Sequence, residues 1–186
     1  MIILAIDPGV TQCGIAVFDP SDHYREAGII CRSFSSEGKG GEEKCADFGR
    51  QLKHLINHYR PDFIAFESAR RDIVPYKRKP DLAGARGPTV NADQMLLPEI
   101  QGHIRQAAIE RNIAFDSVAP RSWRALIYGK GGGALTTDQA KEWARGTCDR
   151  LAIGYHNHNE AEAAMIALWG ATCSQVYKAL IYGVAI

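Results

Sequence analysis

Three short apolar segments near the N-terminus, joined by brief polar links, most constrain how this chain can fold. Residues 2–6 and 14–18 flank a loop that begins at Asp7, and residues 27–34 follow a polar turn. Links of hairpin length connect antiparallel strands, because neighbouring parallel strands need a much longer crossover. The sequence therefore predicts a sheet that begins with three consecutive antiparallel strands.

The rest of the chain alternates helices and strands. Apolar residues recur at helical spacing over residues 42–59, and residues 62–66 form a buried strand that ends at Glu67. Further on, the pattern predicts a strand over 113–118 and helices over 92–111, 120–128, 137–151 and 159–172. Three antiparallel strands, then two parallel strands with helices between them, are the order of an RNase H-like α/β fold. We therefore predict one domain over residues 1–186, with a five-stranded mixed sheet flanked by helices.

Composition excludes some classes of protein. Five cysteines occur without a Cys-x-x-Cys pair, which argues against a zinc ribbon or a disulfide framework and favours buried thiols. No apolar stretch is long enough to span a bilayer, and the N-terminal run lacks a basic lead. We therefore expect a cytoplasmic protein that does not associate with membranes. The net charge is +1, so overall charge does not predict nucleic-acid binding.

Carboxylates follow two strands that should lie side by side. Asp7 ends the first predicted strand and Glu67 the fourth, so in this fold both emerge at the same edge of the sheet. On the last helix, Glu162 shares a face with Asn159 at i, i+3 and with His158 at i, i+4. Hard divalent cations require converging oxygen ligands, and paired cations hydrolyse phosphodiesters. Taken alone, Asp7 can serve a turn and Glu67 can be a surface carboxylate, but their convergence favours a metal site.

The start of the last helix has a structural explanation as well. Asn159 and Glu162 have the spacing of a capping box, in which Asn caps the helix and the acid three residues later reaches back. Asn157 and Glu160 have the same spacing. His158 can be a solvent-exposed histidine, or a metal ligand or proton carrier, since imidazole titrates near neutral pH. The sequence leaves these alternatives open.

Basic residues concentrate in the segment that follows Glu67. A charged loop in solvent would explain them, and so would a surface that binds phosphates. A later loop, Gly129–Gly133, is rich in glycine, which lets a backbone approach a phosphate closely. The candidate DNA-binding residues are Arg70, Arg71, Lys77, Arg78, Lys79 and Arg86 in the first segment, and Arg121, Arg124 and Lys130 further on.

Four motifs together resemble the RuvC Holliday junction resolvases. They are Ile6-Asp7-Pro8-Gly9 with Gly14-Ile15-Ala16-Val17, then the segments Arg60–Glu67, Val118–Arg124 and Asn159–Ala167. They occur in the family's order along nearly the whole chain. The resemblance implies a homodimeric, Mg²⁺-dependent endonuclease that nicks two strands of a four-way junction or acts on other branched DNA.

The resemblance also implies roles for single residues. Asp7, Glu67 and Glu162 match three of the family's four acidic positions and would hold two Mg²⁺ ions, for which Mn²⁺ can substitute. Asn159 stands at the remaining acidic position, where it is a neutral oxygen donor. His158 beside it would complete the catalytic set as a ligand or proton carrier.

Two departures from the family concern DNA. Residues 68–71 lack the aromatic wedge that these resolvases place just after their second acid. Thr137 and Asp138 stand where the resolvases often have a lysine, so Lys130 is the substitute that the sequence offers.

Two other functions fit parts of the sequence. A module that keeps this fold and binds DNA without cutting it would explain the altered acid set. A phosphotransferase-like ATP-binding domain shares the pattern Asp-x-Gly-x-Thr, present here from Asp7 to Thr11, but it needs two such halves and a longer chain. The sequence as a whole favours the nuclease.

Overall fold

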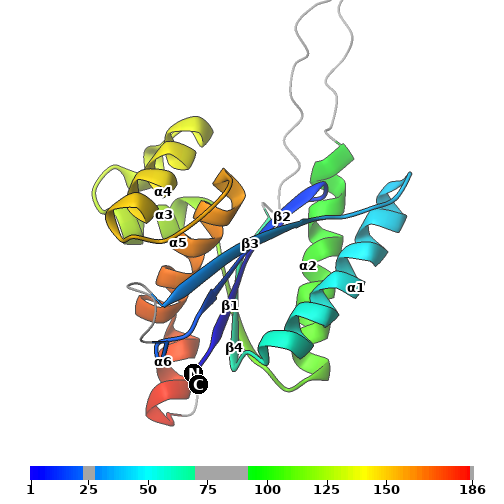
Figure 1. Ribbon diagram of the computed structural model, residues 1–186, viewed down its shortest axis with the longest axis horizontal. Helices are drawn as coiled ribbons and strands as arrows, with labels where there is room; N and C mark the ends of the chain where they lie inside the picture. Colours follow the sequence, from blue (N-terminus) through cyan, green and yellow to red (C-terminus); the bar gives the residue numbers. More distant parts are fainter. Residues whose placement is uncertain (23–27, 70–91, 185–186) are drawn as a thin grey trace, which may run out of the picture.

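The computed structural model describes residues 1–22, 28–69 and 92–184, and at its centre is a five-stranded mixed sheet (Figure 1). The strands are ordered β3-β2-β1-β4-β5. Their bounds are β1 Ile3–Asp7, β2 Gln12–Phe18, β3 Ile29–Ser35, β4 Phe63–Glu67 and β5 Ala114–Val118. β2 pairs antiparallel with β1 and β3, whereas β4 pairs in parallel with β1 and β5. The predicted sheet is confirmed.

Helices cover both faces of the sheet, with α1 and α2 on one face and α3 to α6 on the other (Figure 1). Their bounds are α1 Gly41–Tyr59, α2 Ala92–Glu110, α3 Pro120–Tyr128, α4 Thr137–Arg150, α5 His158–Thr172 and α6 Gln175–Tyr182, with a 3₁₀ turn, η1, over Gly132–Ala134. The first five helices match the predicted ranges to within one residue at each end. The sequence did not predict α6 and η1.

Alternate residues of the central strands serve two separate cores. In β1, Ile3 and Ala5 belong to the core that contains α5, whereas Leu4 and Ile6 belong to the core that contains α1 and α2. A strand buried on both faces is apolar throughout, which is why the sequence pattern of β1 does not alternate. Asp7 continues the series of Ile3 and Ala5, so its side chain leaves β1 on the face that α5 covers.

Glycines let α5 lie directly on the sheet. Gly14 of β2 pairs with Asp7, and a Cβ at Gly14 would overlap the carbonyl oxygen of Asn159 at the start of α5. Further along the helix, a Cβ at Gly170 would stand 3.1 Å from the Cβ of Ala65 in β4. There is no room for a side chain at Gly14 and little room at Gly170. The height of α5 above the sheet is therefore set by contact with the strands.

The cysteines are free thiols. Cys13, Cys31, Cys45 and Cys148 are buried and Cys173 is partly buried, so the predicted buried thiols are confirmed for four of the five. None of the helices in the described part of the chain has the length and apolar character that a bilayer crossing requires.

Candidate active site

Asp7 and Glu67 lie at the carboxyl ends of two adjacent parallel strands. Ile6 of β1 is in register with Phe66 of β4, so the two acids are the next residues on strands that run side by side. In-register residues of parallel strands point to the same face, which for Asp7 is the face that α5 covers. Both acids are partly exposed. The structure thus brings together the two strand-end acids that the sequence singled out.

Glu162 reaches the same region from the second turn of α5, where its side chain is buried. Burial raises the pKa of Asp7 well above its ordinary value, and the negative charges of Glu67 and Glu162 raise it further, while Arg124 and Lys141 oppose the shift. Burial also raises the pKa of Glu162, against the opposing charge of Arg124. The carboxylates of Asp7 and Glu162 therefore share a poorly hydrated region near the charge of Glu67, in which ionised forms need a positive charge nearby.

The start of α5 is capped by Asn157, whose side chain accepts a hydrogen bond from the amide of Glu160 at 3.0 Å. The buried carboxylate of Glu160 accepts from Ser33 Oγ at 2.7 Å and from the amide of His156 at 2.9 Å. Burial opposes ionisation, yet these hydrogen bonds hold the pKa of Glu160 below its ordinary value. The pair Asn157 and Glu160 therefore fixes the helix start, and the alternative cap by Asn159 is wrong. Glu162 has no part in capping.

Asn159 and His158 lie at the edge of this region. Asn159 is partly buried, and its Nδ2 donates to Gln12 Oε1 of β2 at 3.1 Å. Burial, and then the positive charges of Lys141 and Arg145, lower the pKa of His158. The neutral imidazole is thereby favoured, which is the form that can ligate a metal or accept a proton.

Glu67 is held through both its side chain and its backbone. Trp123 of α3 is fully buried, and its indole Nε1 donates to Glu67 Oε2 at 2.7 Å. Gln101 of α2 donates from Nε2 to the carbonyl oxygen of Glu67 at 3.0 Å. Sequence reasoning assigned no role to either residue. The proline that starts α3 marks the helix in the sequence, but which of its residues faces Glu67 depends on how α3 packs.

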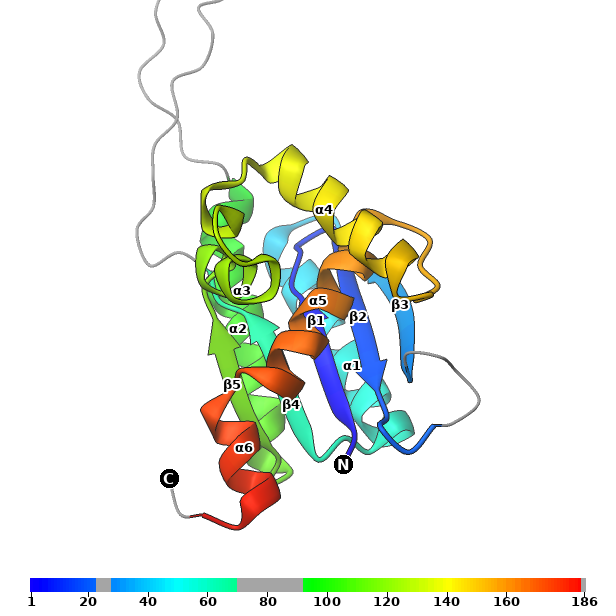
Figure 2. The same cartoon turned by 90° about the vertical axis from the view of Figure 1, so that its left-hand side faces the viewer.

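Two basic residues lie among the acids. Arg124 of α3 pairs with Glu162, with Arg124 Nη2 3.1 Å from Glu162 Oε1, and the two side chains are only 12% and 8% exposed. The guanidinium of Arg124 is therefore paired within the protein, although the sequence predicted that Arg124 binds DNA. The positive charge of Lys141 in α4 opposes the rise in the pKa of both Asp7 and Glu162. Sequence reasoning missed this residue. Figure 2 shows α3, α4 and the start of α5 gathered at this end of the sheet.

The other candidate DNA-binding residues are exposed or lie outside the described residues. Arg121 and Lys130 are exposed, the latter between Gly129 and Gly131. The six basic residues of the segment after Glu67 lie outside the part of the chain that the structure describes; they are Arg70, Arg71, Lys77, Arg78, Lys79 and Arg86.

The donor set suits a hard divalent cation. Carboxylates of Asp7, Glu67 and Glu162 and the amide oxygen of Asn159 are the kinds of ligand that Mg²⁺ and Mn²⁺ accept. Among the described residues, no three His, Cys, Asp or Glu side chains stand close enough together to enclose an ion. Glu67 and Glu162 instead bond to Trp123 and Arg124. Burial first, and then the negative charges of Glu67 and Glu162, raise the pKa of Asp7, and a cation would favour its ionised form.

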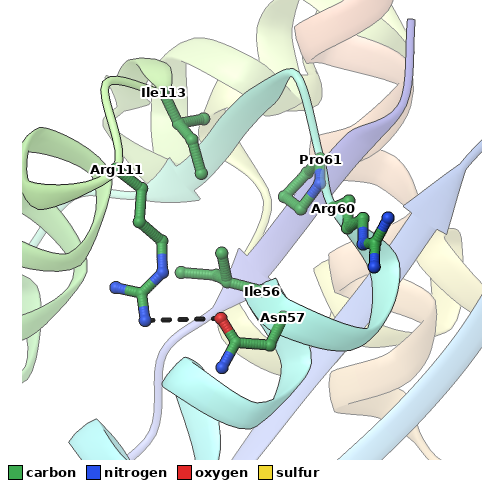
Figure 3. Close-up of a pocket in the computed structure, with 6 residues that line it drawn as sticks. All are labelled: Ile56, Asn57, Arg60, Pro61, Arg111 and Ile113. Carbon is green, nitrogen blue, oxygen red and sulfur yellow. Dashed lines mark hydrogen bonds between the residues drawn. The ribbon is translucent and has the colours of Figure 1, made fainter.

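A pocket lies at the other end of the sheet, away from the acids (Figure 3). Its walls come from the end of α1, the turn into β4 and the turn between α2 and β5. Arg111 reaches across it toward Asn57, with 3.5 Å between Arg111 Nη2 and Asn57 Oδ1. Because β4 starts here and carries Glu67 at its far end, this pocket is separate from the candidate site.

No family model matches the chain. Over 70 residues it is 31% identical to the crossover junction endodeoxyribonuclease RuvC of Synechococcus sp. (strain RCC307), which covers 36% of this chain and 45% of that protein. The solved Thermus thermophilus RuvC matches with a TM-score of 0.59 at 18% identity, covering 98% of this chain and 97% of that one. T. thermophilus RuvC in complex with Holliday junction substrate gives a TM-score of 0.60 at 16% identity, covering 97% and 96%. This chain has the RuvC fold.

The RuvC fold extends over the whole described chain, whereas the sequence match to Synechococcus RuvC spans less than half of that protein. The fold resemblance predicted from the four motifs is therefore confirmed, and with it the RNase H-like arrangement. Within the RuvC fold, Asp7 and Glu67 end β1 and β4, and Glu162 faces them from α5. The chemistry of Asp7, Glu67 and Glu162 follows from their positions and from the charges around them.

Proposed function

We propose that this protein is an endonuclease that uses divalent metal ions to resolve Holliday junctions. The observation that carries the proposal is that Asp7 and Glu67 end adjacent parallel strands and Glu162 lies near enough on α5 to act on the same region, where burial and then the charges of the two glutamates raise the pKa of Asp7. The similarity to RuvC proteins, one of them solved with a Holliday junction substrate, supports the class of substrate. Magnesium is the proposed ion, with manganese as a substitute.

The acids would hold two metal ions. Asp7, Glu67 and Glu162 would supply the carboxylate ligands. Asn159 or His158 would complete the set. When bound, such ions activate a water molecule and stabilise the leaving oxygen of the phosphodiester. A carboxylate offers about four lone-pair sites, so a hydrogen bond to Glu67 or Glu162 is compatible with a metal ligand on the same group.

The surrounding residues oppose protonation of two of the acids and help to hold them in place. Arg124 and Lys141 supply positive charge that partly offsets the rise in the pKa of Asp7 and of Glu162 caused first by burial. The hydrogen bonds of Glu160 to Ser33 and to the His156 amide fix the rotation of α5, so Glu162 faces the sheet. Each of these contacts acts before substrate arrives, which is how a protein preorganises an active site.

DNA would approach from the end of the sheet where the acids lie. Arg121 and Lys130 are exposed on α3 and on the loop after it, and they would contact phosphates. The basic segment that follows Glu67 would add further phosphate contacts. Resolution of a four-way junction requires two nicks, so we propose that two copies of the chain act as a homodimer, each supplying one site.

The experiment that tests this function compares labelled four-way junction, replication fork and linear duplex in Mg²⁺, Mn²⁺ or EDTA. We expect paired nicks in the junction that require a divalent ion, and loss of those nicks in Asp7→Asn. Sedimentation of the protein with and without junction tests the dimer. Junction binding without any cut in Mg²⁺ or Mn²⁺ would refute the nuclease and identify a binding module that has lost catalysis.

A further inference from the structure

Trp123 donates the hydrogen bond that a buried indole requires to one of the candidate metal ligands. It is fully buried at the start of α3, and its Nε1 donates to the carboxylate of Glu67 at 2.7 Å. A hydrogen bond to an ionised acceptor is shorter and stronger than one between neutral groups. An indole can only donate, so it favours the ionised form of Glu67 and cannot ligate a metal itself.

The indole is itself held on several sides. Its ring lies 5.7 Å from that of Tyr128 in an edge-to-face arrangement, and the guanidinium of Arg124 lies 5.2 Å from the ring centroid. Because Trp123 is anchored in the core, its N–H has a fixed direction. The hydrogen bond to this N–H therefore restricts the orientation of the Glu67 carboxylate. Gln101 fixes the backbone of the same residue from the opposite face of the sheet.

We propose that Trp123 is a positioning residue whose indole N–H orients the Glu67 carboxylate for a divalent cation at the ends of β1 and β4. The inference rests on the proposed metal-dependent function and names a residue that the function needs but that does not touch the substrate. Groups that orient metal ligands in this way commonly contribute about 10–100-fold to metal affinity or activity. We expect a loss in this range when the N–H is removed.

The variant that removes the N–H and keeps an aromatic ring is Trp123→Phe. Its matched control is Trp169→Phe, the same change at another buried tryptophan of the same core, two helical turns beyond Glu162 on α5. We expect Trp123→Phe to weaken Mg²⁺ binding, measured by calorimetry without DNA, by about tenfold or more. Trp169→Phe should bind Mg²⁺ like the parent. In cleavage assays the Mg²⁺ concentration for half-maximal rate should rise for Trp123→Phe alone, with junction affinity unchanged.

A second measurement uses the parent indole and does not depend on how Trp123→Phe folds. The chain has three tryptophans, so a ¹⁵N-labelled sample gives three indole N–H signals, and the signals lost in Trp143→Phe and in Trp169→Phe identify that of Trp123 by elimination. That signal should shift in Glu67→Gln and on addition of Mg²⁺. It should stay in place in Glu160→Gln, which alters a buried glutamate on the other side of α5.

The outcomes separate this inference from the proposed function. The positioning role would be overturned if the chemical shift of the Trp123 indole changed neither in Glu67→Gln nor on addition of Mg²⁺. Equal losses of Mg²⁺ affinity in Trp123→Phe and Trp169→Phe would also overturn it. An indole that responds, in a protein that binds Mg²⁺ but cuts no junction, would support the positioning role while refuting the nuclease.

Discussion

Replacing Arg124 by glutamine should destabilise the protein strongly, because it leaves Glu162 without its cation. Arg124 Nη2 lies 3.1 Å from Glu162 Oε1, and the side chains are 12% and 8% exposed. Coulomb's law with an effective dielectric constant of about 20 gives an attraction of about 5 kcal/mol at this separation. Breaking a buried pair by removing one partner typically costs about 3–5 kcal/mol. We therefore expect the free energy of unfolding to fall by about that amount at pH 7.

The loss should depend on pH. Burial already raises the pKa of Glu162, and Arg124 is the strongest influence that lowers it, so Arg124→Gln raises this pKa further. A carboxyl whose pKa is higher in the folded protein than in the unfolded chain destabilises the fold when it is ionised. The penalty disappears as falling pH protonates the group. The defect should therefore be largest near pH 7 and should shrink toward acidic pH.

The loss of stability is measured by guanidinium chloride unfolding at pH 7 and at an acidic pH. The proteins compared are the parent, Arg124→Gln and the double variant Arg124→Gln/Glu162→Gln. The double variant should recover much of the lost stability, because it removes the stranded charge. Arg145→Gln, at an exposed position of α4, is the matched control and should change stability little. A loss below about 1 kcal/mol, as for an exposed ion pair, or a double variant no more stable than Arg124→Gln, would refute the reasoning.

The remaining predictions concern single acids and one lysine. Asp7→Asn should abolish cleavage and leave junction binding unchanged or stronger in a gel-shift assay. It should also raise the free energy of unfolding at pH 7, because it removes a carboxylate whose pKa is raised in the folded protein. Cleavage equal to the parent's would contradict this prediction. Glu162→Ala should reduce the nicking rate far more than Glu160→Ala. Glu160→Ala should instead lower the free energy of unfolding by about 1–3 kcal/mol, since it leaves the partly buried hydroxyl of Ser33 and the main-chain amide of His156 without their acceptor. The reverse ranking of the two nicking rates would count against the site. Lys130→Ala should weaken junction binding and reduce the slope of log affinity against log salt by about 1, and an unchanged slope would remove Lys130 from the DNA contacts.

The sheet and the two strand-end acids were predictable because both follow from local rules. Turn residues and hairpin-length links place β1 beside β2, and the two-sided apolar pattern of β4 marks a central strand that ends at Glu67. Once the order of strands is known, Asp7 and Glu67 must emerge together. The short helix α6 was missed although it has local signals at both ends, the N-cap Ser174 and the C-cap glycine Gly183.

The choice of helix cap could not be made from the sequence. Asn157 with Glu160 and Asn159 with Glu162 have the same spacing, so a local rule cannot separate them. Ser33, which is 127 residues away in the chain, decides the question by donating to Glu160. Non-local packing also explains why Trp123 and Lys141 were missed, since their importance depends on how α3 and α4 lie against the acids.

Gly14 carries no functional group, yet the dimensions of the candidate active site depend on it. It stands beside Asp7 in the sheet and beneath the first turn of α5, where even a methyl group would collide with the backbone. Alanine there would lift the helix, and the carboxylate of Glu162 would rise with it, away from its partners across the strands. A hydrogen atom at position 14 therefore sets the gap that any bound ion must bridge.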